Sequence, residues 1–72
     1  MSTSYYVSDG RIHGPNGDTQ FYLSNRHLHG PNGYTRFYLA DGHFHGPNGY
    51  TKCFLSGLHI DGTVENMPFW GK

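Results

Sequence analysis

Apolar and polar residues alternate along this chain in short segments that return every sixteen residues. The segment Tyr5–Ser8 has counterparts at Phe21–Ser24, Phe37–Ala40 and Cys53–Ser56. Alternation of this kind is typical of β-strands with one buried face, because successive side chains of a strand point to opposite sides. The pattern predicts an all-β protein with one domain over residues 1–72. Its four repeats cover approximately residues 5–20, 21–36, 37–52 and 53–68.

Two kinds of turn signal separate these segments. The pentapeptide His-Gly-Pro-Asn-Gly begins at His13, His29 and His45, and Asp-Gly occurs at Asp9 and Asp41. Asn-Gly and Asp-Gly favour tight hairpin turns, since both residues tolerate positive φ. Each repeat is therefore predicted to be a β-hairpin, and successive hairpins should form an antiparallel meander.

The turns also predict which residues face each other. Two-residue turns at Asp41-Gly42 and Asn48-Gly49 pair Leu39 with Phe44 and place His45 beside Lys52. The equivalent turn one repeat earlier places His29 beside Arg36. One face of the sheet then collects the apolar side chains of Tyr5, Val7, Ile12, Phe21, Leu23, Leu28, Phe37, Leu39, Phe44, Cys53, Leu55 and Ile60. The other face collects Tyr6, His13, Gln20, Tyr22, His27, His29, Arg36, Tyr38, His43, His45, Lys52, Phe54, His59 and Asp61.

The apolar face needs a cover, because a contiguous apolar patch of this size is not stable in water. No helical pattern is present, so we expect a homodimer in which the apolar faces of two sheets pack into a sandwich. Two other folds remain open, closure into a small barrel and a β-solenoid with one repeat per coil. Residues 63–72 depart from the repeat and are predicted to form a cap, in which Phe69 and Trp70 cover an open end of the core or cross onto the partner of the dimer.

Composition limits the partners, disulfides and cellular location that we expect. The chain has 72 residues and a formal net charge of zero at pH 7, which argues against nucleic acid or an acidic membrane surface as a partner. Cys53 is the single cysteine, so no disulfide forms within the chain. With no apolar run long enough for a membrane helix and no leader pattern at the start, we expect a soluble, cytoplasmic protein.

A repeated surface is typical of binding and assembly proteins, whereas catalysis requires unlike groups that converge on one point. The polar face groups Tyr22, His29 and Arg36, and then, in the next repeat, Tyr38, His45 and Lys52. A ring, an imidazole and a cation together can stack on a ligand ring and donate hydrogen bonds. We therefore expect a non-enzymatic, homo-oligomeric binding or assembly module that presents these residues to a ligand or a protein partner. Binding of a glycan or of single-stranded nucleic acid by the aromatic face is an alternative.

The histidines suggest a second class of function. Residues two apart on a strand point the same way and lie about 6.5 Å apart, so two imidazoles can reach one metal ion. The pairs are His27 with His29 and His43 with His45, and the related pair is His59 with Asp61. The main expectation is a protein without a cofactor. As an alternative, these pairs predict a site for zinc or nickel. Duplication of a strand residue explains the same pattern without any metal.

No catalytic residue is predicted. Cys53 falls on the apolar face, away from the histidines, so it is expected to be a buried apolar side chain rather than a nucleophile. The carboxylates Asp9 and Asp41 belong to turns, and Asp18 follows one. No pair of carboxylates is arranged for general acid and base catalysis.

Overall fold

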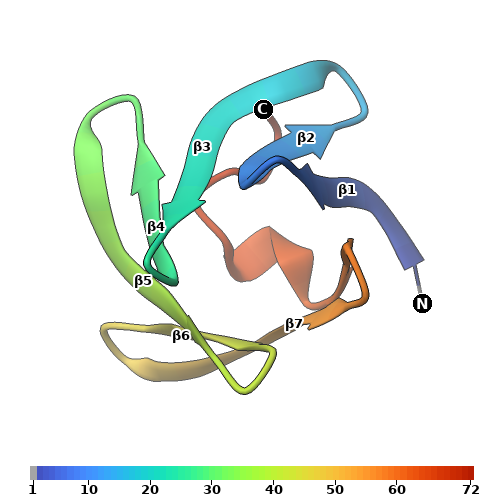
Figure 1. Ribbon diagram of the computed structural model, residues 1–72. Helices are drawn as coiled ribbons and strands as arrows, with labels where there is room; N and C mark the ends of the chain where they lie inside the picture. Colours follow the sequence, from blue (N-terminus) through green and yellow to red (C-terminus); the bar gives the residue numbers. More distant parts are fainter. Residues whose placement is uncertain (1) are drawn as a thin grey trace.

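The structure is a computed structural model that describes residues 2–72, and its strands form one closed antiparallel barrel (Figure 1). The elements are β1 (Ser2–Ser8), β2 (Arg11–Gly14), β3 (Gly17–Ser24), β4 (His27–Gly30), β5 (Gly33–Ala40), β6 (His43–Gly46), β7 (Gly49–Ser56), β8 (His59–Gly62) and the 3₁₀ helix η1 (Val64–Asn66). Each strand pairs with the next, and β1 pairs with β8. The antiparallel meander is confirmed in its small-barrel form. The parallel solenoid is wrong.

The predicted apolar face is the inside of this barrel. Ile12, Leu28, Phe44, Cys53 and Ile60 are completely buried there. Closure thus buries, within one chain, the face for which a homodimeric sandwich was expected, and no second chain is needed to cover it. The homodimer stays a prediction, and sedimentation at a mass of 8.1 kDa would contradict it.

Four equivalent hydrogen bonds join successive hairpins into a ring. In each, the backbone N–H of an apolar strand residue donates to the carbonyl of the second turn residue of the preceding hairpin. The pairs are Leu23 with Gly10 at 2.6 Å, Leu39 with Arg26 at 2.7 Å, Leu55 with Gly42 at 2.7 Å and Val7 with Leu58 at 2.7 Å. The last pair joins the fourth hairpin to the first, so the sixteen-residue repeat becomes a pseudo-fourfold ring.

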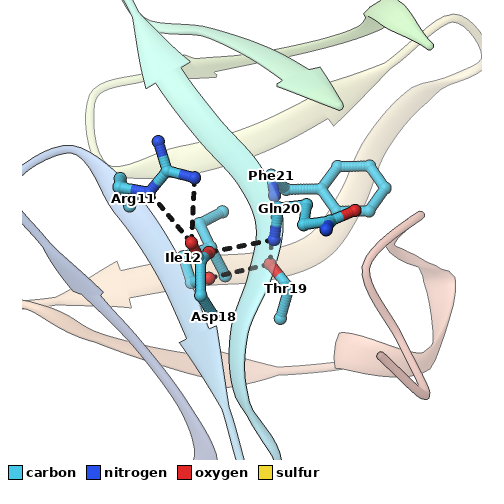
Figure 2. Close-up of polar contacts among 6 residues, drawn as sticks. All are labelled: Arg11, Ile12, Asp18, Thr19, Gln20 and Phe21. Carbon is cyan, nitrogen blue, oxygen red and sulfur yellow. Dashed lines mark hydrogen bonds and ion pairs between the residues drawn. The ribbon is translucent and has the colours of Figure 1, made fainter. Parts of the chain in front are cut away.

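A β-bulge interrupts each long strand at a threonine. In β3, the hydroxyl of Thr19 donates to the carbonyl of Ile12 at 2.7 Å and accepts from the N–H of Phe21 at 3.3 Å (Figure 2). Thr35 and Thr51 make the equivalent bonds in β5 and β7. The hydroxyl replaces the ladder partners that the bulge removes, so these polar side chains can face the interior.

The bulges correct the predicted register. Phe44 faces Cys53 as expected, but His45 faces Tyr50 rather than Lys52, and a two-residue turn at Pro47-Asn48 joins the strands. The fixed φ of proline suits the first central position of a turn, so Pro-Asn takes the centre in place of Asn-Gly.

The same shift applies one repeat earlier. There His29 faces Tyr34 rather than Arg36. The predicted pairing of His29 with Arg36 and of His45 with Lys52 is therefore wrong.

The C-terminal segment lies inside the ring of strands as it is seen in Figure 1. Val64, Met67 and Phe69 from this segment join the core. The Phe69 ring is completely buried, and its centroid lies 5.2 Å from that of Tyr5. Trp70 packs less closely and remains 52% exposed. No helix within residues 2–72 has the length and apolar character needed to cross a membrane.

Candidate functional site

The outer face of the barrel carries stacked pairs of tyrosine and histidine. Tyr22 stacks on His29 with ring centroids 5.2 Å apart and planes inclined by 13°. Tyr38 and His45 repeat the arrangement at 5.2 Å and 15°. Each pair comes from directly opposite residues of adjacent strands, β3 with β4 and β5 with β6. The structure thus brings together the aromatic and imidazole members of the predicted binding set.

A further tyrosine extends each pair. The centroid of the Tyr34 ring lies 5.3 Å from the ring centroids of both His29 and His27, so Tyr34 contacts both imidazoles. Tyr50 contacts His45 at 5.5 Å and His43 at 5.3 Å in the same way. We call the rings of Tyr22, His29, Tyr34 and His27 the first ladder. The second ladder consists of Tyr38, His45, Tyr50 and His43.

Tyr34 and Tyr50 were absent from the predicted site because the register there was wrong. The bulge after each tyrosine moves it opposite the second histidine of the His-x-His pair. The signal in the sequence was the proline of the pentapeptide, which fixes where the turn is centred. Thr35 and Thr51, directly after the tyrosines, mark the bulge itself.

Arg36 and Lys52 are exposed but are not part of the ladders. Each is in a bulge with positive φ, 71° for Arg36 and 66° for Lys52. A residue other than glycine is strained in this backbone region, which costs about 1–2 kcal/mol of folding free energy per residue. Within residues 2–72 the structure gives neither cation an ion pair. Both remain close in sequence to ladder tyrosines, on the same strands.

The first repeat has a different contact where the ladders have histidine and tyrosine. Arg11 stands at the position of His27, and Asp18 at that of Tyr34. The Arg11 guanidinium donates to the Asp18 carboxylate at 2.8 Å, and the N–H of Gln20 donates to its other oxygen at 2.9 Å (Figure 2). These bonds, led by that of Gln20, hold the pKa of Asp18 below its usual range. Only the stack of Tyr6 on His13 remains of a ladder here.

The His-x-His pairs point outward, but their imidazoles contact phenol rings instead of converging. In the part of the chain that the structure describes, residues 2–72, no group of three His, Cys, Asp or Glu residues is placed to hold a metal ion. His59 faces Tyr6 across the closing pair of strands, and among residues 2–72 one buried carboxylate oxygen of Asp61 has no hydrogen-bond partner. Zinc or nickel would therefore have to displace Tyr34 or Tyr50 to be bound by these pairs.

Cys53 is placed as predicted, inside the barrel and away from the histidines. Burial, with smaller contributions from the charges of Asp61 and Glu65, raises the pKa of Cys53 to about 12. A thiol is a nucleophile in its thiolate form, so this side chain is unreactive near neutral pH in the folded protein.

No family model matches the chain, and no curated protein or solved structure matches it either. The candidate site is therefore defined by the geometry of the outer face and of the barrel rim.

Proposed function

We propose that this protein is a non-enzymatic binding module that holds a neutral, ring-containing ligand on the outer face of β3 to β7. The single observation behind the proposal is the pair of ladders. Their tyrosines are the most regular exposed apolar feature of the molecule, with 38% of Tyr22, 48% of Tyr34, 40% of Tyr38 and 47% of Tyr50 accessible.

Stacking makes these rings suitable for binding. A tyrosine that is already packed on an imidazole loses little conformational freedom when a ligand arrives, which lowers the entropic cost of association. The ring faces offer apolar contact, and the phenol and imidazole groups at the edges offer hydrogen bonds. The zero net charge of the chain favours an uncharged ligand.

The two ladders also favour a ligand that is itself repetitive. They are equivalent by the sixteen-residue repeat, so two like groups of one ligand could bind at once. When two linked groups bind, the second binds at a high effective concentration and overall affinity rises without new contacts.

The other two predicted functions have less support. A metal ion would compete with the contacts that Tyr34 and Tyr50 make to the imidazoles. Single-stranded nucleic acid requires cations that follow the phosphates between stacking rings. Arg36 and Lys52 supply one cation each to β5 and β7, whereas β3 has Gln20 at that position, and neither cation lies opposite a ladder histidine.

A thermal-shift screen tests the proposal. The probes are a set of neutral oligosaccharides, a mixed-sequence single-stranded oligonucleotide, and Zn²⁺ and Ni²⁺. We expect an oligosaccharide to raise the melting temperature, since a ligand that binds only the folded state stabilises it by mass action. Tyr22→Ala with Tyr38→Ala should remove most of that shift.

Tyr6→Ala is the matched control, because Tyr6 stacks on His13 in the repeat that lacks a ladder tyrosine. It should leave the shift unchanged. A shift that Zn²⁺ or Ni²⁺ alone produces and that His43→Ala abolishes would contradict the proposal in favour of the metal site. A shift with the oligonucleotide alone would contradict it in favour of nucleic acid.

A further inference from the structure

The barrel rim that carries the Pro-Asn turns contains two equivalent clefts beside the C-terminal segment. One, of about 300 Å³, is lined by the hairpin tip at Gly30–Gly33, by Tyr34 and Thr35 and, on the inner side, by Phe21 and Pro68. The second, also about 300 Å³, is lined by the corresponding hairpin tip at 46–49, by Tyr50 and Thr51, and by Phe37 and Asn66. This size is at the lower end of small-molecule sites.

A third cleft lies at the first hairpin. It is wider, about 440 Å³, and is lined by Tyr5 and Pro15, which occupy the positions of Phe21 and Pro31 in the repeat. Its other wall comes from the C-terminal segment and includes Trp70 and Glu65. Each cleft therefore combines a half-exposed aromatic ring with a planar side chain that can form hydrogen bonds.

The two equivalent clefts depend on glycine in two ways. A Cβ at Gly30 or Gly46 would lie 2.6 or 2.7 Å from the ring of Phe21 or Phe37, so glycine lets that ring form the floor. Gly33 and Gly49 have φ of 112° and 113°, and within residues 2–72 no atom beyond the glycine and its two chain neighbours lies within 4 Å of the Cβ position, which leaves room for a ligand there.

Some polar groups of these clefts are available to a ligand, and others are already hydrogen-bonded within the protein. The side-chain amides of Asn32 and Asn48 make no hydrogen bond to another residue within 2–72, and neither residue has a positive φ. By contrast, the hydroxyls of Thr35 and Thr51 are engaged with the backbone of the bulge. Ligand recognition would thus fall to the amides and the tyrosine rings.

We infer that each cleft binds one sugar ring of a neutral glycan, so that the rim is a multivalent carbohydrate site. The electron-rich face of an aromatic ring attracts the C–H groups of a pyranose, and a planar amide or carboxylate can bind neighbouring hydroxyls. Apart from Lys72 beside Pro68, the two equivalent clefts have no charged side chain. This inference rests on the proposed function, because Tyr34 and Tyr50 belong both to ladders and to clefts.

The C-terminal segment takes the place that a fourth Pro-Asn turn would have at the rim. After Gly62, where the other repeats form the Pro-Asn turn, the chain continues to Val64, which is buried in the core. The N–H of Thr63 donates to the carbonyl of Lys52 at 3.0 Å and fixes this departure. In the fourth repeat, the residues that follow Gly62 therefore pack into the core instead of forming a turn. They also supply walls for the neighbouring clefts.

Amide NMR spectra of the ¹⁵N-labelled protein, titrated with cellobiose, chitobiose, lactose and mannobiose at millimolar concentration, test the inference. We expect at least one disaccharide to shift the backbone resonances of Gly33 and Gly49 and the side-chain amides of Asn32 and Asn48. The double variant Asn32→Leu with Asn48→Leu should bind about tenfold more weakly, as expected for the loss of hydrogen bonds in a preformed site.

Asn16→Leu is the matched control, because Asn16 has the same place in its turn but does not line the third cleft. It should retain full affinity, and its folded spectrum shows that leucine is tolerated in such a turn. The inference is overturned if none of the four disaccharides shifts these resonances, or if the Asn32 and Asn48 double variant binds as well as the control. Binding that Tyr22→Ala with Tyr38→Ala removes, with cleft resonances unmoved, supports the ladders alone and also overturns it.

Discussion

Arg11 and Asp18 form an ion pair at the position where the next two repeats place a histidine against a tyrosine. The pair joins β2 to β3, as His27 with Tyr34 joins β4 to β5. A side-chain contact thus occurs at this position in the first three repeats, as an ion pair in the first and as a ring contact in the next two. The first repeat keeps a polar link and no extended ladder, which leaves the aromatic surface on β3 to β7.

Asp18 should make the protein sensitive to acid. Its pKa is lowered in the folded state by the Gln20 N–H and by Arg11, so the unfolded chain binds the proton more readily. The stability that Asp18 contributes is present above its unfolded pKa of about 3.9 and is lost as the pH falls through the folded value. Circular dichroism melts between neutral pH and strong acid should show a smaller acid-induced drop for Asp18→Asn than for the wild type. Asp9→Asn is the control, and an equal drop in all three proteins would contradict the role of Asp18.

Gly46→Ala should destabilise the barrel by about 1–3 kcal/mol, the usual cost of an overpacked core. The new methyl would lie 2.7 Å from Cε2 of the Phe37 ring, and the backbone at Gly46 itself has no positive φ. Urea unfolding measures the loss. Phe37→Leu in the same chain should recover part of it, since the two sites share one contact. Strictly additive losses in the double variant would show that the ring and the methyl do not meet.

Thr51→Val should cost about 1–3 kcal/mol, because it leaves the buried carbonyl of Phe44 and the N–H of Cys53 without their partner. The substitution keeps the shape of the side chain, so the loss reports the hydrogen bonds. Thr35→Val should cost less, since Thr35 is more exposed than Thr51. Chemical denaturation of both variants is the measurement, and an unchanged midpoint for Thr51→Val would refute the role of the hydroxyl in the bulge.

Lys52→Gly should stabilise the protein by about 0.5–1 kcal/mol, because glycine adopts positive φ without the strain that lysine bears there. Lys52→Ala removes the same charge but keeps the strain, so it is the matched control and should give no gain. Thermal melts of the two variants separate backbone strain from charge. If alanine stabilises as much as glycine, the charge and not the φ angle was the unfavourable feature.

Cys53 should react with a thiol reagent only when the barrel opens. At pH 8 the native protein should be modified far more slowly than the unfolded chain, because the buried thiol stays protonated. A folded pKa of about 12, against 9.0 for an unperturbed thiol, means that the thiol contributes stability below pH 9 and loses it as the pH rises toward 12. The alkaline drop in melting temperature should shrink in Cys53→Ala, compared with its own stability at neutral pH. Rapid labelling of the native protein would contradict the buried position.

The pattern of the sequence determined the two faces of the sheet. A period of two fixes which side chains share a face, and the residues at Asp41-Gly42 fix the pairing of Tyr38 with His45 and of Leu39 with Phe44. These are local properties, carried by neighbouring residues and one short turn. The stacked tyrosine and histidine pairs of the candidate site result from them directly.

Tertiary structure alone decided how the apolar face is covered, and contacts between strands set the register that completes the ladders. Whether a meander stays open, meets a second copy or closes depends on the accumulated twist and tilt of all its strands, to which the four bulges contribute. The alternation of apolar and polar side chains is the same in an open sheet, a dimer and a closed barrel, so it does not distinguish them. The bulges that place Tyr34 and Tyr50 against histidines are stabilised by threonine bonds to a neighbouring strand. The register of these strands depends on contacts between them. The alternation of apolar and polar residues within one strand does not specify that register.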